Sequence, residues 1–221
     1  IPCGVWAWAR LAAQRSISPA QAPASSVAQS QPASSVIGSV LTGDRIVVQA
    51  VEGTGKTAPA WTDGNTITFN LDKIDSATSV DDLIRLTGLN YHELGHAMFT
   101  PRQGSRLARE VMGKGWFDAF NILEDQRLET FLTFIYPSTV PYFTATFMRY
   151  CTQDQRSWEG NFLLMYGRKY LPKKVRDEFR ARFTSPHLIP EAERIIDRYR
   201  ELVFPRDDQE GLALIEAFAE V

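Results

Sequence analysis

The chain has 221 residues, of which 44% are hydrophobic and 11% aromatic, with 24 basic and 26 acidic side chains. This composition excludes a wholly disordered or collagen-like protein, and the net charge of −2 argues against a nucleic-acid partner. No stretch of about 18 apolar residues is present, so we expect no membrane span. The two cysteines, Cys3 and Cys151, exclude a disulfide scaffold and favour reduced thiols in a cytoplasm-like compartment.

Residues 1–43 differ in composition from the rest of the chain. Residues 1–15 are apolar with two arginines and could form a short helix, and no charged residue occurs from Ser16 to Gly43. A segment of Ser, Ala, Pro and Gln cannot bury enough apolar surface to offset its ordering entropy. We therefore expect a linker or an arm that wraps a surface, through which an assembly partner could bind. The first residue is Ile rather than Met, as in a processed product or a fragment.

Strand patterns follow the arm. Residues 45–51 are rich in β-branched side chains, and residues 66–71 alternate in polarity after the turn-forming residues 63–65. Two or three such strands predict a small antiparallel sheet. Within 53–57, the sequence Gly-Thr-Gly-Lys-Thr is similar to the end of a phosphate-binding loop, but Ala50 replaces the required first glycine. We therefore interpret this segment as a glycine-rich turn.

Helical patterns occupy the rest of the chain. Ser79 and Asp82 match a capping box, which predicts a helix from there to about Phe99, ending before Pro101. Further helices are expected at 105–112 and 116–135, and then throughout 141–221, where prolines 172, 186, 190 and 205 separate them. The sequence therefore predicts an α+β, predominantly helical fold. Its expected parts are the arm (1–43), a core with the functional site (44–136) and a helical C-terminal subdomain (137–221).

The most specific motif is His92-Glu93-Leu94-Gly95-His96. Residues four apart share one face of a helix, so both imidazoles can bind a single metal ion. Glu93 lies at the edge of that face, where it can reach a metal-bound water without being a ligand. Two nitrogen ligands, an open position and a carboxylate base are what zinc-dependent hydrolysis requires. The alternative is a pair of hydrogen-bonded histidines on a helix face.

A catalytic zinc ion usually has a third protein ligand, and the candidate carboxylates are Glu124, Asp125 and Glu129. Glu124 lies in an apolar stripe of its helix, where an unpaired carboxylate would be costly, and we expect it to be this ligand. Asp125 and Asn121 are candidates for supporting a histidine Nδ1–H from outside the ligand set. The alternative for Glu124 is a buried salt bridge with Arg127.

These motifs together resemble a zincin metallopeptidase of the gluzincin kind. The resemblance rests on residues 61–68, the His92–His96 motif and Asn121-Ile-Leu-Glu-Asp125, and it is closest to zincin-like domains of phage and bacterial proteins that often carry a von Willebrand factor type A domain. It implies a zinc ion held by His92, His96 and Glu124, with Glu93 as general base and the strand at 66–71 lining the cleft as an edge strand. Gluzincins place an Asp four residues after the ligand Glu, where this chain has Leu128.

An oxyanion-stabilising residue is less well defined. His187 and Tyr142 are eligible by residue type, as are Tyr150 and Tyr166, because some gluzincins use a distal His or Tyr in this role. The position of His187 between prolines favours a surface histidine instead.

The sequence therefore predicts a zinc-dependent peptidase that acts on a peptide or protein substrate, in the cytoplasm or within a virion. The rival hypothesis is a catalytically silent zincin-like assembly protein, for example a component of a phage particle, whose arm wraps partner subunits. The intact Glu93 favours the enzyme, because a silent site does not need a general base.

Overall fold

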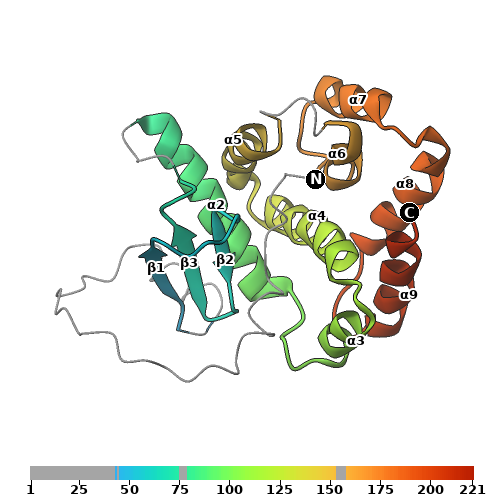
Figure 1. Ribbon diagram of the computed structural model, residues 1–221, viewed down its shortest axis with the longest axis horizontal. Coiled ribbons are helices and arrows are strands. Elements are labelled where there is room, and N and C mark those ends of the chain that lie inside the picture. Colours follow the sequence, from blue (N-terminus) through green and yellow to red (C-terminus); the bar gives the residue numbers. More distant parts are fainter. Residues whose placement is uncertain (1–42, 44, 75–78, 153–157) are drawn as a thin grey trace.

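The computed structural model describes residue 43 and residues 45–74, 79–152 and 158–221. The short helix expected at 1–15 and the expected arm at 16–42 lie outside the described residues. Within them the fold is α+β and predominantly helical, as the sequence predicts. A three-stranded sheet lies at one side, helix α2 lies against it, and the other helices gather around α4 (Figure 1).

The sheet has the strand order β1-β3-β2, with β1 at Val47–Val51, β2 at Ala60–Thr62 and β3 at Thr66–Asn70. Strands β2 and β3 form an antiparallel hairpin, whereas β1 pairs with β3 in parallel. The sheet is therefore mixed rather than antiparallel, because the hairpin returns the chain to the direction of β1. Strand β3 is the central strand, so the expectation that residues 66–71 form the edge strand of a cleft is wrong.

Helix α2 (Val80–Phe99) begins at the predicted capping box. The side chain of Ser79 accepts a hydrogen bond from the backbone N–H of Asp82, whose carboxylate accepts one from the backbone N–H of Ser79. One face of α2 packs Leu94 against the buried side chains of Ile46 and Ile67 in the sheet region. The opposite face contacts helices, and this face carries the histidines.

Glycines allow α2 to approach those helices closely. A Cβ added at Gly95 would lie 2.7 Å from methyl groups of Leu128 and Leu132 on α4 (Phe117–Ile135). A Cβ added at Gly88 would lie 2.5 Å from the backbone oxygen of Tyr142 on α5 (Val140–Cys151). The sequence motif therefore has glycine at position 95 because a neighbouring helix packs there.

Helix α4 lies at the centre of the helical part (Figure 1). The main hydrophobic core joins it to helices on the side away from α2, through buried residues such as Phe120, Leu123, Ile196 and Ile215. The remaining α-helices of the described residues are α3 (Arg106–Lys114), α6 (Trp158–Met165), α7 (Lys173–Arg182), α8 (Ile189–Tyr199) and α9 (Asp208–Ala219). Neighbours on both sides bury α4 over most of its length, polar residues included.

Among the helices of the described residues, none combines the length and the apolar character needed to cross a bilayer.

The contact at Gly88 generates a test of helix packing. Gly88→Ala places a methyl group against the backbone of α5, so we expect a loss of about 1–3 kcal/mol in the free energy of unfolding. Gly113→Ala on α3 is the control, because its Cβ would meet nothing within 4 Å and alanine favours a helix by about 0.5–1 kcal/mol. Urea unfolding of both variants measures the two changes. An increase in stability for Gly88→Ala would contradict the packing described here.

Candidate metal centre

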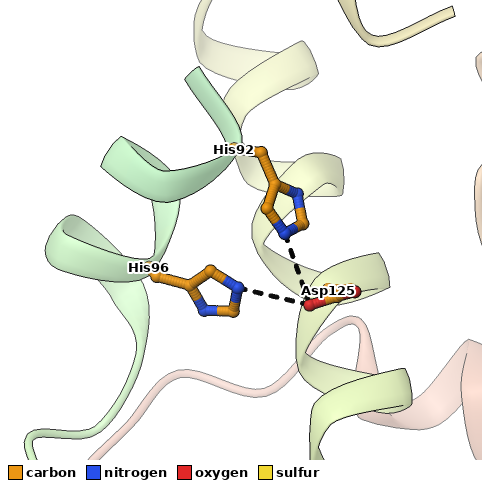
Figure 2. Close-up of side chains that lie close together, drawn as sticks. All are labelled: His92, His96 and Asp125. Atoms are coloured by element: carbon orange, nitrogen blue, oxygen red, sulfur yellow. Dashed lines mark ion pairs between the residues drawn. The ribbon is translucent and has the colours of Figure 1, made fainter. Parts of the chain in front are cut away.

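Two histidines of α2 and one aspartate of α4 converge at a buried point between the helices. The Nε2 atoms of His92 and His96 lie 3.5 and 3.2 Å from Asp125 Oδ1 (Figure 2). All three side chains are buried, and Asp125 is only 1% exposed. The four-residue spacing of the two histidines on α2 turns both imidazoles toward α4, as the motif predicts.

The spacing of these atoms suits a small metal ion. A tetrahedral zinc ion with bonds of about 2.0–2.1 Å holds its ligand atoms about 3.3 Å apart. The two distances to Asp125 Oδ1 bracket that value, and the donor atoms of the three residues all lie within 4.8 Å of one another. Within the described part of the chain, Asp125 Oδ1 makes no hydrogen bond although it is buried. The donor types of these three residues and their distances to Asp125 Oδ1 therefore fit a zinc ion.

The orientation of His96 is fixed by a hydrogen-bonded chain that ends at Glu124. The hydroxyl of Thr100 lies 2.9 Å from His96 Nδ1 and donates to Glu124 Oε1 at 2.8 Å. Because the hydroxyl proton goes to the carboxylate, Thr100 accepts the Nδ1–H of His96. In the neutral imidazole this leaves the Nε2 lone pair directed toward Asp125, where a metal ligand needs it.

The orientation of His92 is fixed by Glu129. Its Oε1 atom accepts a hydrogen bond from His92 Nδ1 at 2.9 Å, and the carboxylate is held in turn by Arg168 and Tyr170. Both imidazoles therefore present Nε2 to the same point, and each Nδ1 is engaged by a group outside the ligand set.

The position of Glu124 corrects the predicted ligand set. Arg127 donates to both carboxylate oxygens of Glu124, at 2.8 and 2.6 Å, and the hydroxyl of Tyr199 lies 3.3 Å away. Glu124 is thus engaged by the buried salt bridge that was the alternative interpretation. Asp125, predicted to lie outside the ligand set, instead places its Oδ1 beside the Nε2 atoms of both histidines, because successive residues of a helix point about 100° apart.

The other predicted site residues lie elsewhere. Asn121 is buried one turn before Asp125, and within the described residues no hydrogen bond joins it to either histidine. His187 is exposed in a short 3-10 helix between α7 and α8. The ring of Tyr142 packs edge-on against that of Tyr91, with the two ring centroids 5.6 Å apart. Among the described contacts, neither supplies a group to the metal centre.

Sequence reasoning missed Thr100, Arg168 and Tyr170. Thr100 follows His96 by four residues, so the helical spacing that identified the histidines could also have identified it. The sequence indicates Glu129 as a candidate ligand but not as the partner of His92. Arg168 and Tyr170 lie 39 and 41 residues after Glu129, and no local pattern indicates a contact over that separation.

Glu93 lies beside this centre with a buried carboxylate. The side chain is 2% exposed, and its Oε1 has no hydrogen-bond partner in the described part of the protein. Burial raises the pKa of Glu93, and the nearby His92 and His96 oppose that rise. A raised pKa increases the proton affinity of the carboxylate, which suits a general base.

Charges within the centre stabilise one another in the metal-free protein. Burial lowers the pKa of His92, but Asp125 and Glu129 outweigh it and raise that pKa to about 10. Burial raises the pKa of Asp125, yet the two histidines hold it well below its usual range. A divalent cation would replace the proton of His92 in compensating these carboxylates.

A scan against protein-family models, a search of curated proteins and a search of solved structures found no match to the chain. Conclusions about its chemistry therefore rest on the geometry of the centre.

The two neighbouring carboxylates of α4 can be distinguished by isosteric substitution. Asp125→Asn removes the charge from the ligand position, and we expect zinc affinity to fall by more than about 100-fold, beyond the usual effect of changes outside a ligand set. Glu124→Gln should keep most of the affinity but lower the free energy of unfolding by about 3–5 kcal/mol, because Arg127 loses its buried partner.

Competition with a chelator measures the affinity of each variant, and urea unfolding measures its stability. If Glu124→Gln releases zinc while Asp125→Asn retains it, the ligand assignment is wrong.

Proposed function

We propose that the chain is a zinc-dependent peptidase in which His92, His96 and Asp125 hold the metal and Glu93 is the general base. The observation that carries the proposal is the convergence of three buried donor atoms, with both histidine Nε2 atoms at about the spacing of a tetrahedral zinc site from Asp125 Oδ1. The sequence resemblance to zincin metallopeptidases supports it, although Asp125 rather than Glu124 supplies the third ligand in this proposal.

A zinc ion in such a site lowers the pKa of a coordinated water to about 7 and withdraws electrons from a substrate carbonyl. Three protein ligands leave the fourth tetrahedral position open for that chemistry. The contacts to Glu129 and Thr100 keep both imidazoles directed at the metal throughout the reaction.

Glu93 performs the proton transfers in this proposal. Its carboxylate accepts a proton from the attacking water and then donates it to the nitrogen of the departing amine, so the general base ends the cycle unprotonated. Its raised pKa favours the first of these transfers, and its buried, unbonded oxygen is available for it.

The substrate class proposed is a peptide or protein in extended conformation. Strand β2 is an outer strand of the described sheet and contacts α2, which carries Glu93. An outer strand can pair with an added peptide, whereas the central β3 cannot. A location in the cytoplasm or within a virion stays a prediction from the sequence.

The variant Glu93→Gln tests this proposal. We expect it to lower kcat by about 10²–10⁴-fold, because the amide cannot accept the proton, and to leave zinc affinity nearly unchanged, because Glu93 is not a ligand. Cleavage of a fluorogenic peptide library by the zinc-loaded protein provides the rate, and chelator competition provides the affinity.

Asp81→Asn is the control, because it removes an exposed carboxylate from the same helix. Activity in Glu93→Gln equal to that of Asp81→Asn would exclude Glu93 as the base. A wild-type protein that binds zinc but cleaves no peptide would support the rival assembly role.

A further inference from the structure

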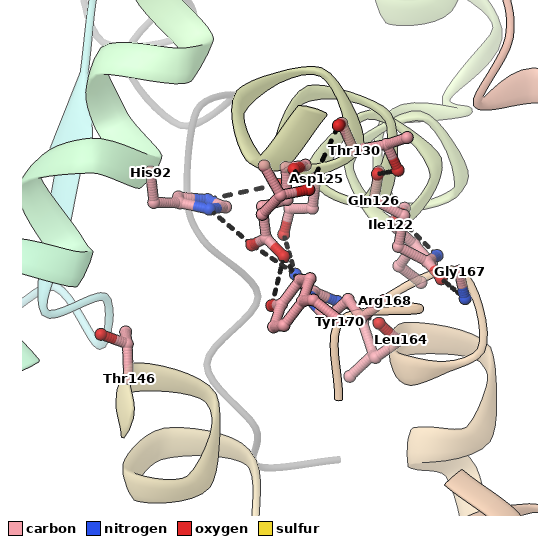
Figure 3. Close-up of polar contacts among 12 residues, drawn as sticks. His92, Ile122, Asp125, Gln126, Thr130, Thr146, Leu164, Gly167, Arg168 and Tyr170 are labelled. Atoms are coloured by element: carbon pink, nitrogen blue, oxygen red, sulfur yellow. Dashed lines mark hydrogen bonds and ion pairs between the residues drawn. The ribbon is translucent and has the colours of Figure 1, made fainter. Parts of the chain in front are cut away.

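The carboxylate of Glu129, which orients His92, has every acceptor position filled. Its Oε1 accepts from His92 Nδ1 at 2.9 Å and from Arg168 Nη2 at 3.0 Å. Figure 3 shows the side chains of His92, Asp125, Arg168 and Tyr170 close together. Its Oε2 accepts from Arg168 Nε at 2.8 Å and from the Tyr170 hydroxyl at 2.7 Å. An ionised carboxylate offers about four lone-pair sites, so these four donors saturate it. Glu129 therefore has no lone pair left for a metal ion.

We propose that Arg168 and Tyr170 are positioning residues of the metal centre, acting on His92 through Glu129. The three residues Glu129, Arg168 and Tyr170 are called the Glu129 cluster below. By occupying three of the four acceptor sites of Glu129, Arg168 and Tyr170 leave the carboxylate one orientation in which it accepts the Nδ1–H of His92. The cluster thereby selects the imidazole tautomer and rotation that direct Nε2 at Asp125.

The freedom that Glu129 would have without these partners explains why the positioning matters. Glu129 follows Asp125 by one helical turn on α4 and lies within reach of His92. A carboxylate without Arg168 and Tyr170 could rotate away from Nδ1 or compete with Asp125 for a cation. Arg168 prevents both, because its planar guanidinium binds both oxygens of Glu129 and its Nη2 also lies 3.6 Å from Asp125 Oδ2.

The two positioning residues belong to the connection between α6 and α7, which is docked on α4. The backbone N–H of Gly167 donates to Gln126 Oε1 at 2.6 Å, and Gln126 Nε2 donates to the backbone oxygen of Leu163 at 3.0 Å. A Cβ at Gly167 would lie 2.6 Å from Gln126 Oε1, so glycine is required for this approach. Gln126 and Glu129, three residues apart on α4, thus bind the same connection.

The inference rests on the proposed zinc site for its effect on metal affinity, but the orientation of His92 can be measured without metal. The chain offers a matched pair of variants for both measurements. The Tyr170 hydroxyl donates to Glu129 at 2.7 Å, and the Tyr166 hydroxyl, four residues earlier, donates to Asp197 at the same distance. Each Tyr→Phe change removes one hydroxyl bound to a carboxylate, and only Tyr170 belongs to the Glu129 cluster.

We expect Tyr170→Phe to lower zinc affinity by about tenfold, as changes behind a metal-binding histidine do, and Tyr166→Phe to leave it unchanged. Arg168→Lys should lower affinity further, by up to about 100-fold, because lysine cannot bind both oxygens of Glu129. Arg200→Lys is its control, since Arg200 binds Thr130 on α4 instead. Chelator competition measures all four variants, and Tyr170→Phe suffices if Arg168→Lys does not fold.

The readout specific to positioning is the Nδ1–H of His92 in the metal-free protein. With only three histidines in the chain, nitrogen-15 NMR of labelled imidazoles resolves this group. Tyr170→Phe should speed its exchange with water while the Nδ1–H of His96, bound by Thr100, is unaffected. Tyr166→Phe should change neither.

Equal exchange rates of the His92 Nδ1–H in the two Tyr→Phe variants would overturn the inference, even if zinc affinity falls, because the effect would then be a general loss of stability. Absence of zinc binding by the wild-type protein would instead overturn the proposed function. The exchange measurement would still decide whether Arg168 and Tyr170 position His92.

Discussion

The structure depends on the pairing of buried charges along one helix. From Glu124 to Glu129, α4 buries five polar side chains of six, and only Leu128 is apolar. An unpaired charge in such a place would cost several kcal/mol, so each needs a partner. Glu124 and Arg127 pair with each other on α4. The partners of Asp125 and Glu129 come from α2 on one side and from the α6–α7 connection on the other. The requirement for pairing therefore determines which elements can surround α4.

Two glutamate–arginine pairs flank Asp125, the proposed metal ligand on α4. Glu124 pairs with Arg127 and reaches His96 through Thr100, while Glu129 pairs with Arg168 and reaches His92 directly. In each case an arginine holds a carboxylate and the carboxylate orients an imidazole. Asp125 lies between the two pairs, which leaves its Oδ1 for the proposed metal. Imidazoles that are already held in place would lose little entropy on binding that ion, and this would favour tight binding.

Sequence patterns predicted the elements well and the partners of buried charges poorly. The capping box at Ser79 and the four-residue spacing of His92 and His96 are local signals, and both gave correct geometry. The choice between Glu124 and Asp125 required knowing which side of α4 faces α2. The hydrophobic periodicity of α4 does not contain that information, because polar and apolar residues alike are buried around this helix. The role of Arg168 could not be predicted from the sequence, because its contact with Glu129 joins residues 39 apart in the chain and depends on tertiary folding.

The docking of the α6–α7 connection on α4 also has a consequence for the order of events during synthesis. His92, His96 and Asp125 leave the ribosome well before Arg168 and Tyr170, which follow Asp125 by 43 and 45 positions in the chain. At about 5–20 residues per second this interval is on the order of seconds, long compared with helix formation. Until then Glu129 lacks three of its four donors. A nascent chain can thus contain His92, His96 and Asp125, the proposed ligands, before their final arrangement is attainable.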